Sequence, residues 1–138
     1  MKVKVEVKGD VQLREALNLL GKNATPSLGM ALYVKGEQIM AKAKELTPVD
    51  TGNLRASGHV TLPRIGPHKA EVELGFGGSA GATVGGKYVG YALYVHENLS
   101  AKHKVGQAKF LEAPFVDATS DLEAWLARYL KIVLLGSA

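Results

Sequence analysis

The chain has 138 residues, 46% of them hydrophobic and 22% charged, which is enough for one domain with its own core. It contains no cysteine, so a disulfide framework and a thiolate metal site are excluded. The 17 Lys and Arg give a formal net charge of +4 but form no block of like charges, which argues against a basic tail that binds nucleic acid. Contact with DNA stays open, because a few lysines around a DNA channel would add up in a ring.

No segment predicts secretion or membrane insertion. The N-terminus alternates lysine and valine over residues 2–5 and lacks the apolar stretch of a signal peptide. The longest apolar run, Ile132–Leu135, is too short to span a bilayer. We therefore expect a soluble protein that is made in the cytoplasm.

The first half of the chain predicts one strand followed by two helices. Valines alternate with charged residues over residues 2–8, and this period of two predicts a half-buried strand. Asp10 is placed to cap a short helix over residues 11–20, which Gly21 stops. A longer helix is predicted for Ser27–Leu46.

The longer helix has Thr25 as its predicted N-cap and Pro26 at its first position. Pro48 ends it, because the residue before a proline avoids the helical region. Its apolar stripe is expected at Leu28, Leu32, Ile39, Ala43 and Leu46. Close packing against a sheet or another helix is indicated by the small residues Ala31, Gly36, Ala41 and Ala43.

The second half predicts three strands before a last helix. Strands over residues 59–62 and 70–76 are joined by a loop over 63–69, and Tyr88–Val95 has the aromatic pattern of a third strand. The seven glycines within residues 75–90 exclude a regular element there.

The last predicted helix opens near Pro114 and ends at Gly136, after a polar loop over Asn98–Lys109. Its apolar stripe consists of Phe115, Ala118, Leu122, Trp125 or Leu126, Tyr129 and Val133. The order β-α-α-β-β-β-α indicates an α+β fold, with a small antiparallel sheet packed against the long helix and the C-terminal helix. We expect a single domain over residues 1–138, with a flexible glycine-rich loop at 77–87.

Two glycine patterns imitate nucleotide-binding motifs. Residues 81–87 have the spacing of a phosphate loop, but Tyr88 stands where the magnesium-binding Ser or Thr belongs, and a strand rather than a helix is expected next. Residues 75–80 imitate a dinucleotide fingerprint but open no helix. We expect no nucleotide and no other cofactor.

Two groups of side chains have the composition of a reactive site. His96 and Glu97 with His103 offer two imidazoles and a carboxylate to a metal, but in no established ligand spacing. Ser57 and His59 share a face on a strand, without a nucleophile elbow or an orienting acid. We expect no metal site and no enzymatic activity, and we expect the histidines at the surface or in an interface.

The segment after the long helix predicts a structural turn. Pro48 stops the helix, Asp50 caps the next turn beside Thr51, and Gly52 supplies conformational freedom. Leu54 then becomes buried as the chain enters the next strand. We expect this turn to orient the helix against the sheet without taking part in chemistry.

Three segments, taken in their order along the chain, have distinctive residue patterns. The first is Ala43-Lys44-x-x-Thr47-Pro48-Val49-Asp50-Thr51-Gly52-x-Leu54-Arg55-x-Ser57, the second is Tyr91-Ala92-x-Tyr94-Val95-His96-Glu97, and the third is Gln107-Ala108-Lys109-Phe110-Leu111 followed by Pro114-Phe115. Together they resemble a family of phage tail components, the tail-completion, neck or minor tail proteins of long-tailed phages and prophages. The resemblance spans nearly the whole chain. It departs from the family after Glu97, where Asn98-Leu99-Ser100 replaces the usual x-Gly-Thr, and in the long glycine loop.

The resemblance implies a small α+β virion subunit that acts at the head–tail junction. Such proteins assemble with copies of themselves into a ring around the DNA channel, often a hexamer or dodecamer, and contact other head–tail junction and tail-tube proteins. The resemblance carries over no catalytic residue. It leaves open whether the chain is a tail-completion, head-closure or minor capsid component.

The protein is then expected to act through its interfaces with partner proteins. We expect contacts with partners at the glycine loop and the tyrosines beside it: Gly77, Gly78, Gly81, Gly85, Gly86, Lys87, Tyr88, Tyr91, Tyr94 and His96. A basic nucleic-acid-binding module is the alternative, favoured by a pI of about 9.3. A small hydrolase that uses Ser57 and His59 is a third hypothesis.

Overall fold

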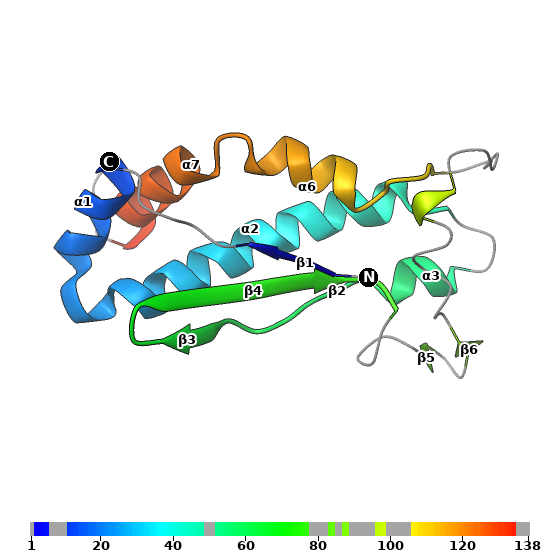
Figure 1. Ribbon diagram of the computed structural model, residues 1–138, viewed down its shortest axis with the longest axis horizontal. Helices are drawn as coiled ribbons and strands as arrows, with labels where there is room; N and C mark the ends of the chain where they lie inside the picture. The colour runs from blue at the N-terminus through cyan, green and yellow to red at the C-terminus, as the bar shows by residue number, and fades with distance from the viewer. Residues whose placement is uncertain are drawn as a thin grey trace.

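The protein folds as helices packed on one side of a small antiparallel sheet (Figure 1). This computed structural model describes residues 2–5, 11–48, 52–77, 83–84, 87–88, 96–98 and 106–134. Strand β1 (Lys2–Val5) comes first, followed by helices α1 (Val11–Leu20) and α2 (Ala24–Leu46), the other strands of the sheet, and helices at the C-terminal end. The α+β fold class that the sequence predicts is confirmed.

The two N-terminal helices follow each other almost without a break. Gly21 ends α1 as predicted, with a φ of +58° that favours glycine, and a 3-10 turn, η1 (Gly21–Asn23), leads directly into α2. The longer helix therefore starts earlier than predicted, and its N-cap is Asn23 rather than Thr25. Pro26 lies inside the first turn, where a missing N–H costs no helical hydrogen bond.

Helix α2 crosses the sheet at close range because two glycines face it. A Cβ at Gly36 would lie 3.1 Å from Val60 Cγ1 and 3.5 Å from Val72 Cγ1. A Cβ at Gly29 would lie 2.5 Å from Ile65 Cδ1. This close approach explains why the apolar stripe of the helix is interrupted near Gly36. The stripe is buried at Leu32, Ile39 and Ala43 and half-buried at Leu28 and Leu46, whereas Ala41 is exposed, contrary to the prediction of close packing there.

Strand β4 (Lys69–Gly75) is the centre of the sheet. β1 pairs with it on one side, from Lys2 opposite Gly75 to Val5 opposite Val72. On the other side it pairs with β2 (His59–Val60) and then with β3 (Arg64–Gly66). The predicted loop over residues 63–69 is thus wrong in part, because it contains β3.

A β-bulge separates β2 from β3. Val60 lies opposite Leu74, and the Thr61 amide donates to the Glu73 carbonyl at 2.8 Å, whereas Arg64 lies opposite Glu71. Residues 62 and 63 therefore face residue 72 alone, so one extra residue is inserted into this strand. Proline is tolerated at such a position because no ladder hydrogen bond needs its N–H.

The predicted C-terminal helix is divided into α6 (Glu112–Thr119), α7 (Leu122–Tyr129) and a π-helical turn, η2 (Leu130–Leu134). Thr119 Oγ1 donates to the Phe115 carbonyl at 2.7 Å, and Ser120 Oγ donates to the Asp117 carbonyl at 3.0 Å. Such bonds compete with the helical ladder, which accounts for the break. Leu122 and Leu126 are buried, and Phe115, Ala118, Trp125 and Tyr129 pack half-buried around the core. None of the described helices is long and apolar enough to cross a membrane.

The glycine-rich stretch contains a short ladder that the sequence did not predict. β5 (Thr83–Val84) pairs antiparallel with β6 (Lys87–Tyr88), with Thr83 opposite Tyr88. The exclusion of regular structure from residues 75–90 is therefore wrong at these positions. Two β-prone pairs around Gly-Gly are a recognised hairpin pattern, and the overall glycine content obscured it. The remainder of the predicted strand Tyr88–Val95 lies outside the described residues.

Candidate functional site

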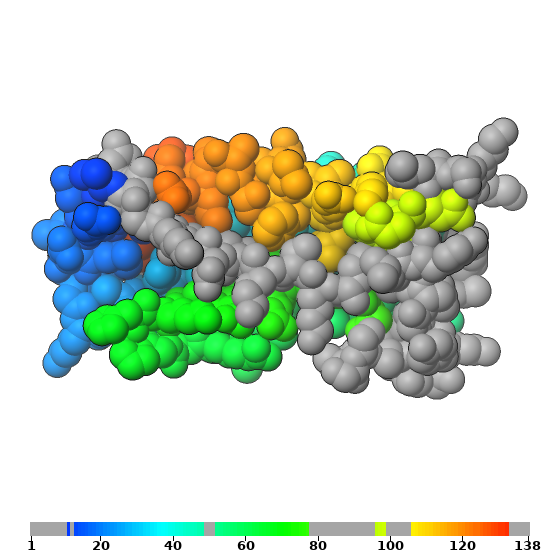
Figure 2. All heavy atoms as spheres, viewed as in Figure 1, coloured from blue at the N-terminus to red at the C-terminus, as the bar shows by residue number. Residues whose placement is uncertain are grey.

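Three segments that are distant in sequence meet where α2 ends. They are Thr47 with α3 (Asn53–Ala56) and Ser57, then residues 96–98, then residues 106–111. We call this region the α2 corner. Figure 1 places it at the end of the molecule away from α1, and Figure 2 shows residues 96–98 beside the start of the segment that leads into α6.

The corner provides hydrogen-bond donors for the last carbonyl groups of α2. The last four carbonyl groups of an α-helix have no N–H partner within the helix. Thr47 Oγ1 donates to the Ala43 carbonyl at 2.7 Å. The Gln107 amide donates to the Leu46 carbonyl at 2.8 Å, and Arg55 Nη2 donates to the Thr47 carbonyl at 3.5 Å. The positive charge of Arg55 also lies near the negative end of the helix dipole. Side chains and backbone from two distant segments thus fix the end of α2.

The structure describes part of the predicted turn. Pro48 is buried, and α2 ends at Leu46 as predicted. Gly52 has a φ of +81°, a left-handed conformation that glycine adopts readily because it has no side chain. Leu54 is buried, although it lies in α3 before the strand rather than at the strand's entrance. Asp50 and Thr51 lie outside the described residues, so the capping role of Asp50 stays a prediction.

Ser57 is a structural residue of the corner. It is 2% exposed, its Oγ donates to the Leu54 carbonyl at 2.6 Å, and the Gly77 amide donates to the same Oγ at 3.1 Å. His59 Nδ1 lies 2.9 Å from the backbone carbonyl of Ser57, not from its hydroxyl. The hydroxyl therefore joins α3 to the end of the central strand, and the Ser57–His59 hydrogen bond that the hydrolase hypothesis needs is not formed. Gly77, predicted as a contact residue, is buried at the base of the glycine loop.

His96 lies in the interior, with 4% of its surface exposed, so its predicted surface position is wrong. Its ring packs edge-on against Phe110, with centroids 5.0 Å apart, and Phe110 packs in the same way against Phe76 at 4.9 Å. His96 Nε2 accepts a hydrogen bond from the Glu112 amide at 3.1 Å, and Nδ1 lies 2.9 Å from Glu97 Oε1. Because Nε2 accepts from the Glu112 amide, Nδ1 is the nitrogen that donates to Glu97. The ring packing and these two hydrogen bonds satisfy this polar side chain in the interior.

Lys109 connects the acidic groups around His96. Its Nζ pairs with Glu97 and lies 3.2 Å from Glu112 Oε2. Hydrogen bonds from Lys109 and then from His96 hold the pKa of the Glu97 carboxyl below its usual value. The hydrogen bond to Glu97 in turn raises the pKa of Lys109. The charges at the corner are thus arranged as an ion-pair network.

The described residues contain one group with three potential metal ligands, formed by His96, Glu97 and Glu112, whose ligand atoms lie within 4.8 Å of one another. A metal on Nδ1 would require a proton on Nε2, which would then face the Glu112 amide hydrogen. The Lys109 ammonium also pairs with both carboxylates. The geometry therefore favours the ion-pair network over metal binding. His103, the third residue of the predicted cluster, lies outside the described residues.

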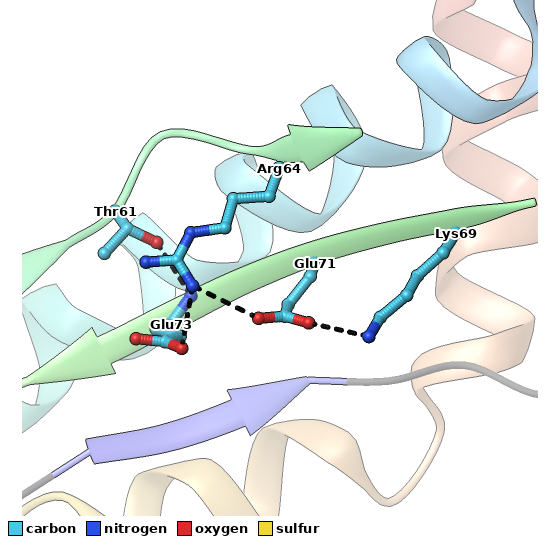
Figure 3. A network of polar contacts seen from close by, with 5 residues as sticks. All are labelled: Thr61, Arg64, Lys69, Glu71 and Glu73. Carbon is cyan, nitrogen blue, oxygen red and sulfur yellow. Dashed lines mark hydrogen bonds and ion pairs between the residues drawn. The ribbon is translucent and has the colours of Figure 1, made fainter. Parts of the chain in front are cut away.

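A second polar cluster covers the sheet face that points away from α2 (Figure 3). Arg64 Nη1 lies 3.2 Å from Glu73 Oε1 and 3.5 Å from Glu71 Oε1, and Lys69 Nζ lies 3.1 Å from Glu71 Oε2. The Glu73 amide donates to Thr61 Oγ1 at 3.0 Å. The glutamate side chains are 9% and 13% exposed, while those of the cations are more than half exposed. Each of these two carboxylates is thus paired with a cation.

Most of the predicted contact surface is not covered by these observations. Lys87 and Tyr88 belong to β6, while Gly78, Gly81, Gly85, Gly86, Tyr91 and Tyr94 lie outside the described residues. The prediction that they contact a partner stays a prediction. Comparison of the chain with protein-family models, with curated proteins and with solved structures gives no match.

Proposed function

We propose that the chain is a non-enzymatic structural subunit of a tailed-phage particle, which assembles into a ring at the head–tail junction. One observation carries the proposal. The described parts of the three segments that resemble the phage tail components, residues 43–48 with 52–57, residues 96–97 and residues 107–111, are separated in sequence but meet in the α2 corner. Convergence at one place is the arrangement expected of residues that share a structural purpose.

The use of polar side chains in the corner supports a scaffold. Thr47, Ser57 and His96 are all buried, and each has a side-chain atom in a hydrogen bond with a backbone group: Thr47 with Ala43 in the last turn of α2, Ser57 with Gly77 and His96 with Glu112. Side chains engaged in this way position backbone and leave no free nucleophile or base. The corner therefore supports a role in holding the shape of a surface that partners contact.

Nucleic-acid binding is the second candidate, because the net charge is +4. Several of the described cations are engaged within the chain: Lys42 pairs with Glu45 at 3.3 Å, and Lys35 Nζ lies 4.7 Å from the centre of the Trp125 ring. Lys109 and Arg64 each pair with two carboxylates. Steeply salt-dependent DNA binding by the isolated subunit would favour this alternative.

The proposal is tested in the phage or prophage that encodes the chain. Deletion of its gene is expected to give DNA-filled heads and finished tails that fail to join, and a plasmid copy is expected to restore joined particles. Antibody labelling in electron micrographs should place the protein at the neck. Joined, infectious particles without the gene product would contradict the proposal.

The predicted contact loop is tested by replacing residues 78–86 with a glycine-serine linker of the same length. We expect joining to fall at least tenfold, while the circular dichroism melting curve of the purified subunit is unchanged. A substitution at the opposite end of the molecule, Lys22→Ala, is the control. Equal joining by both variants would remove the loop from the interface.

A further inference from the structure

The α2 corner contains a guanidinium whose donors are only partly used within the described residues. Arg55 is half-buried, and its Nε is the one buried side-chain nitrogen or oxygen of these residues that has no hydrogen-bond partner. The contact from its Nη2 to the Thr47 carbonyl is long, at 3.5 Å. Nη1 makes no hydrogen bond with the described residues and is not among their buried atoms without a partner, so it reaches solvent. The tip of the guanidinium therefore has N–H donors that an incoming ligand is able to use.

A second cation lies at the same place in the fold. Lys44, in the last turn of α2, is half-buried because its stem crosses Gly58, where a Cβ would lie 2.9 Å from Lys44 Cε. The Gly58 amide donates to the Arg55 carbonyl at 3.2 Å, which places both cations at one junction of α2 and α3. Within the part of the chain that the structure describes, neither of them pairs with a carboxylate, whereas Lys109 in the same corner does.

A role in the fold alone does not account for an arginine at this position. A buried N–H without an acceptor destabilises the folded state, and a half-buried guanidinium loses part of its hydration. A positive charge at the C-terminal end of α2 is favourable, but Lys44 already provides one. An arginine adds a planar fork of N–H groups, which binds two oxygen atoms of one acidic group at once.

The surroundings favour a single carboxylate as the ligand over a polyanion. Among the described residues of the corner, Glu97 and Glu112 share the ammonium of Lys109, and their side chains are 48% and 54% exposed. Such acidic groups repel the closely spaced phosphates of a nucleic acid. A carboxylate on a protein side chain brings one charge, and its two oxygens match the fork of Arg55.

We propose that Arg55 and Lys44 form a binding site for an acidic side chain of a partner protein. The site itself follows from the geometry of the α2 corner. The further statement that the partner is a neighbouring subunit of the particle rests on the proposed function. The two statements are therefore tested separately, first on the purified protein and then in the phage.

NMR on the purified whole protein tests the site. Sodium acetate should shift the resonances of the Arg55 Nε–H and the Gly58 amide, whereas sodium chloride at the same ionic strength should not. Lys44→Gln and Arg55→Lys should each weaken the binding of acetate, measured at Gly58, by about twofold to fivefold, the contribution of one partly exposed ion pair. Arg128→Gln, at an exposed position on α7, is the control and should change nothing. Equal shifts with chloride, or larger shifts with a short DNA duplex than with acetate, would overturn the proposal.

Reversal of the charge tests the partner in the phage or prophage that encodes the chain. Arg55→Glu and Lys44→Glu should each reduce head–tail joining by about tenfold or more, because a carboxylate then faces a carboxylate, while Arg128→Glu should join normally. Mutations that restore joining are expected to replace an aspartate or glutamate, in this chain or in another virion protein, by lysine or arginine. Normal joining by both reversed variants, or restoring mutations that leave every acidic residue in place, would overturn the inference. A phage that joins heads and tails without the gene would contradict the proposed function instead.

Discussion

The substitution Gly106→Ala tests how closely residues 106–111 approach the end of α2. Gly106 has a φ of +85°, and a Cβ there would lie 2.5 Å from the Thr47 carbonyl carbon and 2.6 Å from both Leu46 O and Pro48 N. All three are backbone atoms, so no side chain can rotate away. Gly52 is the matched control, because its φ is +81° and a Cβ there would meet nothing within 4 Å.

Both alanine variants are expected to lose about 1–2 kcal/mol of unfolding free energy, the cost of a left-handed conformation for a residue with a side chain. Gly106→Ala should lose about 1–3 kcal/mol more, because the overlap forces the backbone to shift. Urea unfolding monitored by circular dichroism gives the loss for each variant, provided that the slope of the unfolding free energy against urea concentration is the same in the variants and the wild type. A Gly106→Ala loss within about 0.5 kcal/mol of the Gly52→Ala loss would refute the close approach.

Three further results are expected from the corner. Ser57→Ala should lower the unfolding free energy by about 1–3 kcal/mol, because the buried Gly77 amide loses its acceptor; an unchanged urea midpoint would refute this. Phe110→Ala should cost about 3–5 kcal/mol in the same assay, and a loss typical of a surface site would contradict its burial. The pKa of Glu97 is lowered in the folded state by Lys109 and then His96, so its stabilisation is present above about pH 4.3, its unfolded value, and is lost as the pH falls through the lower folded value. Lys109→Gln should therefore raise the NMR titration midpoint of the Glu97 carboxyl, and an unmoved midpoint would show that the two groups are not paired.

The elements with strong local signals could be predicted from the sequence. Gly21 and Pro48 bound the long helical region because a left-handed glycine and a proline each act on their own neighbours, whatever the rest of the fold does. Gly52 was recognised for the same reason. The interruption of the apolar stripe of the long helix near Gly36 was visible in the sequence as well, although only the approach of Val60 explains it.

The candidate site could not be derived in this way. The roles of Ser57 and His96 depend on partners that are distant along the chain, and neither hydrophobic periodicity nor spacing encodes such pairs. His96 resembled a surface residue because its polar neighbours are visible in the sequence, whereas the Phe110 ring that covers it is not. The break after Thr119 was missed because a hydroxyl that bonds back to its own helix leaves the apolar pattern intact.

The bulge at Leu62–Pro63 bears on how copies of the chain are able to associate. A straight, fully hydrogen-bonding outer strand would let copies add main chain to main chain and grow into fibres of unlimited length. Here the extra residue bends the strand, and Pro63 has no N–H to offer a neighbour. In the proposed ring, association through this side would use side chains such as the exposed Leu62, whose shape would set the angle between neighbours. A defined angle allows an assembly to close on itself and to stop after a fixed number of copies.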